Sequence, residues 1–303
     1  MQKDIRNPYY DKYEPISKGG TLFIPIGMPT LSKMTNDFET RRVTVITGPP
    51  KEGKSSVVHQ IYLNSVDKGF GSVLLDGEHD QSWLLNTLYR KVIGVSPNTF
   101  TRVPYHKKYI LEPTQAGLDM LMEWHKDRMT IISKYLMKHI DTLDQLFTFI
   151  GDVVVKYKCK LLILDNLMTL VEGTQAEKNE NQSRFVKRVC ELAKSHNIHC
   201  IIVAHPNKGA IPGGDMGIYD VSGASEIVNL VDFLIHIKRN YEKNEEDEPD
   251  GWARLLLNRP WGEVGDVPLR FDTQRRTLYE MNGLGNAISY DFNWQGKGKQ
   301  IQL

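Results

Sequence analysis

The segment at residues 48–55 constrains this chain more than any other part of its sequence. It reads Gly48-Pro-Pro-Lys-Glu-Gly-Lys-Ser55 and fits the pattern G-x-x-x-x-G-K-[ST] at every position. In such a loop the backbone N–H groups surround phosphate oxygens, the lysine reaches the β- and γ-phosphates, and the serine hydroxyl binds Mg²⁺. The segment therefore predicts a nucleotide site. The predicted nucleotide-binding residues are Gly48, Pro49, Pro50, Lys51, Glu52, Gly53, Lys54, Ser55 and Ser56.

The residues on either side of this loop favour a strand–loop–helix unit. Val43 to Thr47 is an apolar, β-branched run that is typical of a buried strand. After the loop, apolar residues follow at helical spacing, which predicts a helix that begins at Ser55 or Ser56. The positive end of that helix would face the phosphates. This context makes a chance match to the pattern a poor explanation.

Three further apolar runs end in polar residues: Glu78 closes the run from Ser72, Asp165 closes the run from Lys160, and His205 follows Cys200 to Ala204. The carboxyl ends of parallel strands form the ligand crevice of an open α/β sheet. We expect Asp165 to hold Mg²⁺ together with Ser55. Glu78 is either the base that orients a water molecule or an acid in the first turn of the next helix. His205 either contacts the γ-phosphate or is an ordinary hydrogen-bonded histidine.

The rest of the chain predicts an α/β fold with a mostly parallel central sheet, flanking helices and antiparallel strands at the C-terminal end. Residues 94–127 are expected to be a surface excursion and a helix, with a solvated basic cluster at 106–108. We expect an arm or linker at residues 1–20, one domain at 21–282 and a flexible tail at 283–303. The polar segment 172–183 and the glycine-rich segment 209–217 are predicted loops.

Composition excludes several other classes of protein. The chain has 303 residues, 40% of them hydrophobic, and its three cysteines lack metal-binding spacing. No apolar run is as long as a membrane span, so we expect a soluble protein of a reducing cytosol without a membrane partner. The net charge is +1, so nucleic-acid binding would depend on local arrangements of charge.

The motifs occur in the order found in RecA-like ring helicases. They are Phe23-Ile-Pro-Ile-Gly, the 48–55 loop, Glu78, Leu164-Asp-Asn-Leu167, Ala204-His-Pro206, Ser222-Gly-Ala-Ser225 and Asn258-Arg259. The chain resembles the helicase domain of the DnaB type. It is closer to the Twinkle and phage primase-helicase branch, because His205-Pro206 stands where DnaB carries glutamine. The resemblance covers the chain from Phe23 to Met281.

This resemblance implies a RecA-like P-loop ATPase that uses ATP and Mg²⁺ to unwind DNA. It makes Lys54 and Glu78 catalytic, His205 the sensor of the γ-phosphate, and Arg259 a finger donated to a neighbouring subunit's ATP. It also implies a hexameric ring around single-stranded DNA in the cytoplasm of a bacterial or phage-infected cell, with an organelle matrix also open. Priming and polymerisation would reside on other proteins. The implied DNA-binding residues are Lys208, Gly209, Gly213, Gly214, Ser222 and Gly223.

The chain also departs from the family pattern. Leu257 stands two residues before Arg259, where the family usually has lysine, so a second trans cation is missing or supplied elsewhere. We expect no primase or zinc-binding segment before the domain and no linker helix in residues 1–20. Two alternatives remain open: a strand-exchange ATPase of the RecA or RadA type, and an ATP-gated assembly factor that does not move on DNA.

Overall fold

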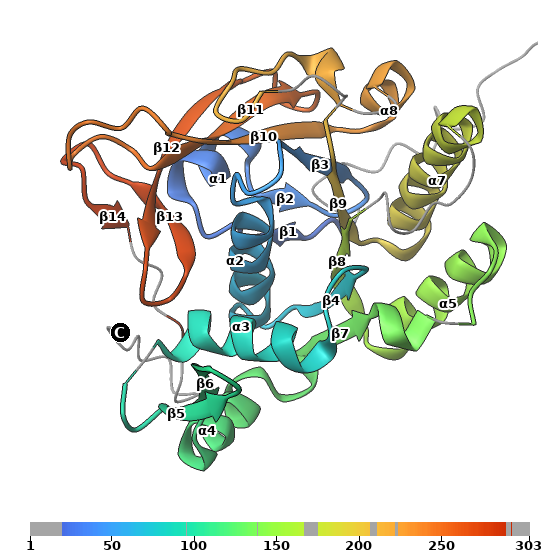
Figure 1. Ribbon diagram of the computed structural model, residues 1–303. Coiled ribbons are helices and arrows are strands. Elements are labelled where there is room, and N and C mark those ends of the chain that lie inside the picture. The colour runs from blue at the N-terminus through green and yellow to red at the C-terminus, as the bar shows by residue number, and fades with distance from the viewer. Residues whose placement is uncertain are drawn as a thin grey trace, which may run out of the picture.

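The structure is a computed structural model that describes residues 20–94, 96–137, 139–166, 175–206, 211–221, 224–288 and 292. Its centre is a ten-stranded sheet with the order β14-β13-β12-β11-β10-β3-β9-β8-β4-β7 (Figure 1). The parallel strands are β3 (Val43–Thr47), β4 (Gly71–Asp76), β7 (Met129–Ser133), β8 (Cys159–Asp165), β9 (His199–Ala204) and β10 (Phe233–Arg239). The antiparallel strands are β11 (Gly251–Asn258), β12 (Gly265–Asp272), β13 (Thr277–Met281) and β14 (Ala287–Ile288). The expected α/β class with antiparallel C-terminal strands is confirmed.

Helices cover both faces of the parallel strands, which explains why those strands are nearly continuous apolar runs. One face carries α2 (Lys54–Asp67), α3 (Gln81–Ile93) and α4 (Gln115–His125). The other carries α5 (Leu143–Lys156), α7 (Gln175–His196) and α8 (Ala224–Leu230). Successive strand residues alternate between the two cores, as a period of two requires: Ile46 packs on the α2 side and Val45 on the α5 and α7 side.

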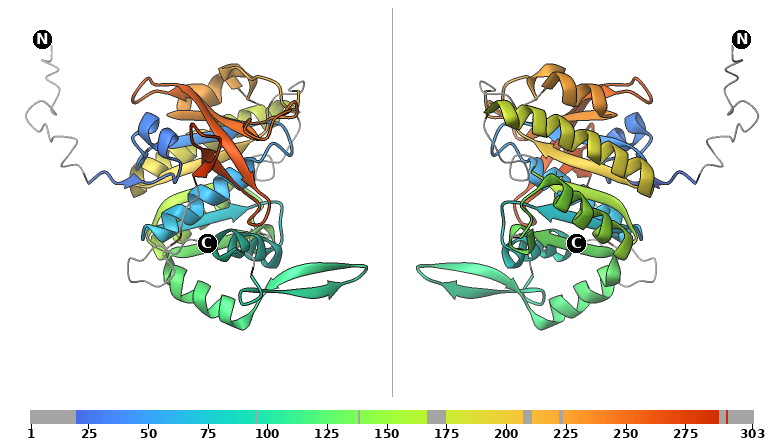
Figure 2. Two further views of the ribbon diagram at one scale, coloured as in Figure 1. Left: turned by 90° about the vertical axis from the view of Figure 1, so that its left-hand side faces the viewer. Right: turned by 90° about the vertical axis from the view of Figure 1, so that its right-hand side faces the viewer.

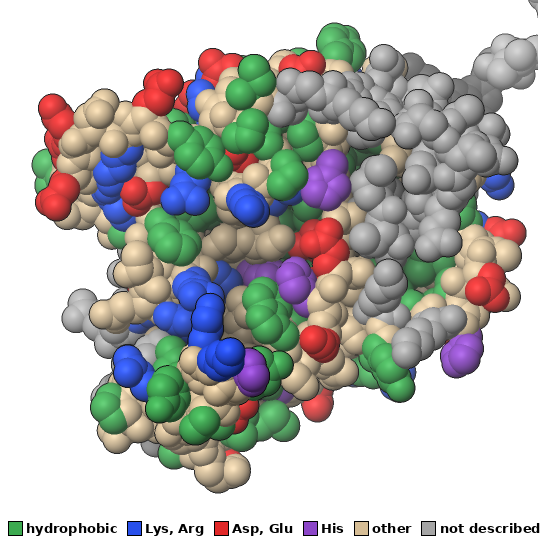
Figure 3. Space-filling view, in the orientation of Figure 1, with side chains coloured by type: hydrophobic (Ala, Val, Ile, Leu, Met, Phe, Trp, Pro, Cys, Tyr) green, Lys and Arg blue, Asp and Glu red, His purple; other side chains and the backbone are tan. Residues whose placement is uncertain are grey.

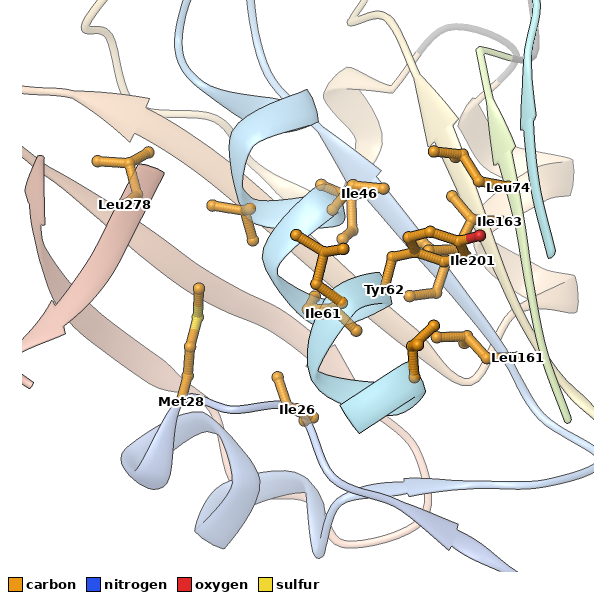
Figure 4. Close-up of a cluster of buried hydrophobic side chains, with 14 of the residues drawn as sticks. Ile26, Met28, Ile46, Ile61, Tyr62, Leu74, Leu161, Ile163, Ile201 and Leu278 are labelled. Carbon is orange, nitrogen blue, oxygen red and sulfur yellow. The ribbon is translucent and has the colours of Figure 1, made fainter. Parts of the chain in front are cut away.

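Helix α2 is the most deeply buried helix at the site and anchors the loop that precedes it. Its Ile61 and Tyr62 are fully buried and pack among the apolar residues of the sheet, as Figure 4 shows. The Tyr62 hydroxyl donates to the carbonyl oxygen of Thr130 at 2.8 Å, so even this buried polar atom is satisfied. These contacts hold the second half of α2 against the sheet.

The remaining elements are short. They are β1 (Phe23–Ile24), α1 (Pro29–Thr35), β2 (Phe38–Glu39), η3 (Lys126–Arg128), η4 (Lys134–Met137) and η5 (Ile218–Asp220). Strands β5 (Phe100–Tyr105) and β6 (Lys108–Pro113) form a separate hairpin that projects from the body of the molecule (Figure 2). The sequence predicted a surface excursion here without its strands. Among the described residues, no helix is both long enough and apolar enough to cross a membrane.

Two segments differ from the expectations. Helix α7 begins at Gln175, inside the segment predicted to be a polar loop, while residues 167–174 lie outside the described residues. In the expected flexible tail, β14 pairs with β13, and Phe292 is fully buried with its ring 5.6 Å from that of Trp124. Burial of the aromatic Phe292 side chain stabilises its position against the domain.

Candidate active site

The loop between β3 and α2 has the backbone that its glycines predict. Gly48 has φ +150°, and a Cβ atom there would lie 2.4 Å from the carbonyl oxygen of Ile237 on β10. Only glycine lets the loop pass this close to the neighbouring strand. Gly53 has φ +99° and directly precedes α2, which begins at Lys54, one residue before the predicted start. The N-terminus of α2 thus opens at the carboxyl ends of the parallel strands.

The Lys54 ammonium is buried within its own loop. Nζ donates to the carbonyl oxygens of Gly48 at 2.7 Å and Pro49 at 2.9 Å, and the residue is only 7% exposed. Burial lowers the pKa of Lys54, and the nearby Asp165 carboxylate opposes that shift. A cation held by carbonyl dipoles alone can exchange them for the oxygens of a triphosphate, which carry full charge.

Asp165 lies at the end of β8, beside the start of α2. The Ser55 hydroxyl lies beside its carboxylate and favours the charged form, and the residue is 6% exposed. Burial raises the pKa of Asp165 to about 6, and the neighbouring Asp76 adds to the shift. The two side chains predicted to hold Mg²⁺ are therefore adjacent, and their hydroxyl and carboxylate oxygens are the hard ligands that this ion prefers.

Glu78 is placed at the site and is not a helix cap. Helix α3 begins at Gln81 with Asp80 at its N-cap position, and neither N-cap nor first turn uses Glu78. Instead, Asn166 Nδ2 donates to Glu78 Oε1 and also lies 3.2 Å from His205 Nε2. One amide thus joins the ends of β4, β8 and β9. Figure 3 shows acidic and histidine side chains together near the centre of this face of the molecule.

His205 is half-buried, in contrast to the exposed Glu78. Burial lowers the pKa of His205, and the positive charge of Lys54 lowers it further. The imidazole is therefore neutral at pH 7 and can form hydrogen bonds without adding charge. Asn166 was missed in the sequence analysis, although its place directly after Asp165 at a strand end was a usable signal.

Asp76 is a second residue that the sequence analysis missed. It pairs in register with Asp165 on the adjacent strand, is 1% exposed, and accepts hydrogen bonds from the backbone N–H groups of Glu78 at 2.8 Å and His79 at 2.7 Å. Its other oxygen lies 3.0 Å from His79 Nδ1, and the His79 ring stacks on Trp83. These contacts fix the turn that presents Glu78.

Glu52 lies in the nucleotide loop, but its carboxylate bonds to backbone N–H groups of other segments and does not face the predicted phosphates. The side chain is 2% exposed and accepts hydrogen bonds from the backbone N–H groups of Gly213, at 3.0 Å, and of Arg239 at the end of β10. The nucleotide loop is therefore tied to the glycine-rich segment that was predicted to bind DNA. Of the other predicted DNA-binding residues, Gly214 is described, whereas Lys208, Gly209, Ser222 and Gly223 lie outside the described residues.

Ser56 contacts a buried lysine that no sequence pattern indicated. Lys91 of α3 is 2% exposed, and its Nζ donates to Ser56 Oγ at 3.2 Å and to the carbonyl oxygen of Arg276. Burial lowers the pKa of Lys91 to about 7, and the positive charge of Arg90 lowers it further. The first turn of α2 therefore has an ammonium group beside it, joined to the turn between β12 and β13.

Arg259 lies in the turn between β11 and β12, where the sequence placed it, and the residue is exposed. Its Nε donates to the carbonyl oxygen of Val231 at 2.9 Å and its Nη2 to that of Val228 at 3.1 Å. These carbonyls belong to the end of α8, where a cation is favourable. Within the chain, then, the guanidinium is held at the C-terminus of a helix and near the surface.

Comparisons with known proteins agree with this fold. The model of the AAA domain family AAA_25 matches residues 29–210, more than half of the chain, so the chain belongs to this family of AAA domains. The Twinkle homolog protein, chloroplastic/mitochondrial, of Arabidopsis thaliana is 24% identical over 275 residues, which cover 89% of this chain. The chain spans 37% of the length of that plant protein.

Two solved structures share the fold. The first is described as an ATPase domain; it superimposes with a TM-score of 0.69 at 15% identity and covers 86% of this chain and 91% of its own. A DnaB-like replicative helicase, described with its interactions with primase, gives a TM-score of 0.70 at 16% identity and covers 91% and 68%. The chain therefore has the RecA-like fold of DnaB-type ATPase domains, as the resemblance implied, with a distant Twinkle homologue.

Proposed function

We propose that this chain is the ATP-hydrolysing motor domain of a replicative DNA helicase, which moves on single-stranded DNA and unwinds duplex. The observation that carries the proposal is the meeting of Lys54, Ser55 and Asp165 with the Glu78–Asn166–His205 group at the carboxyl ends of adjacent strands. The similarity to the plant Twinkle homologue and the shared fold of the DnaB-like helicase support the choice of a helicase.

The residues of the site account for ATP hydrolysis. The loop amides and Lys54 bind the β- and γ-phosphates, and Ser55 and Asp165 would hold Mg²⁺, which neutralises phosphate charge when bound. Glu78 orients the attacking water, and Asn166 holds the Glu78 carboxylate by donating to it. His205, kept neutral by burial and by Lys54, contacts the γ-phosphate and senses its loss.

Arg259 is proposed to complete the site of a neighbouring copy in a hexameric ring. The guanidinium is exposed, and among the described residues it is bonded by carbonyl oxygens and by no carboxylate, so these contacts leave its charge unneutralised. A planar guanidinium supplied across an interface stabilises the transition state only when the ring is assembled. Leu257 offers no second cation at the position where the family usually has lysine.

Movement on DNA is proposed to depend on the contact between Glu52 and Gly213. Glu52 belongs to the nucleotide loop and Gly213 to the glycine-rich segment, so a shift in one displaces the backbone of the other. The Lys208 ammonium, the Ser222 hydroxyl and the backbone N–H groups of Gly209 and Gly223 would hold DNA phosphates. The N–H groups of Gly213 and Gly214 already donate to Glu52 and to the carbonyl oxygen of Ile211, so these two glycines would shape the loop instead. A separate primase and a polymerase are proposed partners, since one DnaB-like neighbour is described with primase.

Arg259→Ala tests the shared site. We expect it to lose DNA-stimulated ATP hydrolysis by a factor on the order of 10³, with nucleotide binding nearly unchanged, because the finger acts on the transition state. Mixing this variant with Lys54→Ala protein should restore part of the activity, because one mixed interface has both residues intact. Arg102→Ala on the projecting hairpin is the matched control and should hydrolyse ATP normally.

The same preparations distinguish the helicase from the two alternatives. Single-stranded DNA should stimulate hydrolysis, and the protein should separate a forked duplex. Open filaments with strand exchange would favour a RecA- or RadA-type ATPase. Hydrolysis that ignores DNA, without strand separation, would favour an assembly factor and contradict the helicase proposal.

A further inference from the structure

Three buried side chains from three elements meet behind the nucleotide loop: His59 of α2, Asp76 of β4 and Asp165 of β8. One ring nitrogen of His59 and one carboxylate oxygen of each aspartate all lie within 4.8 Å of one another. The exposed fractions of these residues are 3%, 1% and 6%. Within the described ranges, no other group of three or more histidine, cysteine, aspartate and glutamate side chains gathers in this way.

The secondary structure brings these residues together. His59 follows Ser55 by four positions on α2, so both side chains lie on the helix face that looks toward the strand ends. Asp76 and Asp165 are register partners on the adjacent parallel strands β4 and β8. The cluster is therefore fixed by the same packing that forms the nucleotide site, and it does not depend on a loop.

One ring nitrogen of the histidine in this cluster has no hydrogen-bond partner among the described residues. His59 Nε2 is buried and unpaired, although buried polar atoms in proteins nearly always have one. Burial lowers the pKa of His59 well below its usual value, so the ring is neutral and keeps the lone pair of one nitrogen. Beside it, the carboxylates of Asp76 and Asp165 are buried next to one another. An imidazole lone pair and two crowded carboxylates are the donors that a divalent cation satisfies.

The surroundings of Asp76 hold it in place as a ligand. The backbone N–H groups of Glu78 and His79 donate to one of its oxygens, and His79 Nδ1 lies 3.0 Å from the other. Carboxylates that bind metals are usually oriented by such outer hydrogen bonds. His79 is itself fixed by its stacking on Trp83, with ring centroids 4.3 Å apart.

We propose that His59, Asp76 and Asp165 form a second divalent-cation site, which takes an ion that accepts imidazole nitrogen together with carboxylate oxygen, such as Mn²⁺ or Zn²⁺. Mg²⁺ prefers oxygen ligands and octahedral geometry, so Ser55 and Asp165 suit it without His59. The two sites share Asp165 and differ in their other ligands. This inference goes beyond the proposed helicase function, because it requires neither ATP nor DNA.

Binding of Mn²⁺ to nucleotide-free, chelator-treated protein tests the proposal, with free Mn²⁺ measured by electron paramagnetic resonance. We expect one bound Mn²⁺ per chain, displaced by Zn²⁺ and not by an equal concentration of Mg²⁺. His59→Leu should weaken binding at least about 10-fold, because it removes the nitrogen ligand. His125→Leu is the matched control: His125 is also buried with an unpaired Nε2, but it lies outside the cluster and should leave affinity unchanged.

A change at a buried histidine can disturb folding, so Asp76→Asn provides the second variant. Its amide oxygen can still accept the backbone hydrogen bonds, and we expect the same loss of Mn²⁺ affinity with an unchanged circular dichroism spectrum. Absence of Mn²⁺ binding by the wild-type protein would overturn the proposal. So would binding that folded His59→Leu or Asp76→Asn protein retains in full, because the ion would then occupy only the Ser55–Asp165 position. Neither result would bear on the helicase proposal.

Discussion

The parallel and antiparallel parts of the central sheet differ in the environment of their charged side chains. At the ends of the parallel strands, Asp76 and Asp165 are buried side by side, and the pKa of Asp165 is raised. In the antiparallel part, Arg254 of β11 forms ion pairs with Asp215 and Asp266, whose side chains are 70% and 44% exposed. The hydrogen bond and charge of Lys238, together with Arg254, lower the pKa of Asp215.

This difference shows that unfavourable electrostatic interactions are concentrated at the carboxyl ends of the parallel strands. Crowding carboxylates away from water destabilises the folded protein unless a ligand cation or a proton compensates. Exposed ion pairs satisfy both charges but contribute little to stability. We therefore expect the carboxyl ends of the parallel strands to serve ligand binding and the antiparallel strands to stabilise the sheet.

The largest expected effect is on catalysis at the parallel end. Glu78→Gln keeps an oxygen that can accept from Asn166 but removes the basic carboxylate, so hydrolysis should fall by roughly 10²–10⁴-fold while ATP binding persists. Steady-state hydrolysis and equilibrium binding of a fluorescent ATP analogue measure the two quantities. The exposed Glu112→Gln on the hairpin serves as control. A fall in the rate of hydrolysis of less than about threefold would show that Glu78 is not the catalytic base.

The next effect concerns stability and its dependence on pH. Asp165 ionises with a pKa near 3.8 in the unfolded chain and of about 6 in the folded protein, so its protonation favours folding. That contribution is fully present below about pH 4 and is lost as the pH rises through about 6. Asp165→Asn, which stays neutral, should therefore raise the free energy of unfolding at pH 7.5 by on the order of 2–3 kcal/mol relative to the wild type.

Urea unfolding in chelator, at pH 4 and pH 7.5, measures this difference, which should nearly vanish at the lower pH. Asp215→Asn is the control, because Asp215 lies in the segment between β9 and η5 and pairs with Arg254 of the antiparallel part. Its exposed ion pairs should change stability by no more than about 0.5 kcal/mol at either pH. Equal changes in the free energy of unfolding for the two substitutions would contradict the expected difference between the two parts of the sheet.

The smallest expected effect lies in the antiparallel part. Arg254→Ala removes both ion pairs of that arginine, and the free energy of unfolding should fall by less than about 1 kcal/mol, because exposed pairs are weak and screened by salt. Raising NaCl from 50 mM to about 500 mM should shrink the difference further. A loss that is larger than this and insensitive to salt would mean that the β11–β12 surface depends on packing of the arginine stem.

The local patterns of the sequence predicted the elements of the site well. The loop from Gly48 to Ser55, the buried strands that end at Asp165 and Ala204, and the closing antiparallel pair were all predicted from residue order, and the structure contains each of them. These features depend on neighbours within a few positions, so the pattern of apolar residues and glycines was sufficient.

The burial of Phe292 was not predicted, because it depends on contact with the distant Trp124. The hairpin at residues 100–113 was also missed, although its strands pair locally, because Pro104 and Pro113 weaken the strand pattern. Helix α7 could not be recognised from its start either, since its first residues, Gln175 to Asn181, are polar and carry no apolar stripe. Strand or helix formation in such segments depends on the tertiary structure around them.

The sequence by itself determined that this chain has a phosphate-binding loop followed by acids at strand ends, because those residues form contiguous motifs. Only the tertiary structure decided which side chains share the site. Asp76, His59 and Asp165 come from three separate elements, and they meet because parallel pairing aligns β4 with β8 and α2 packs across them. Register and helix packing are properties of distant residues brought together, and no local pattern encodes them.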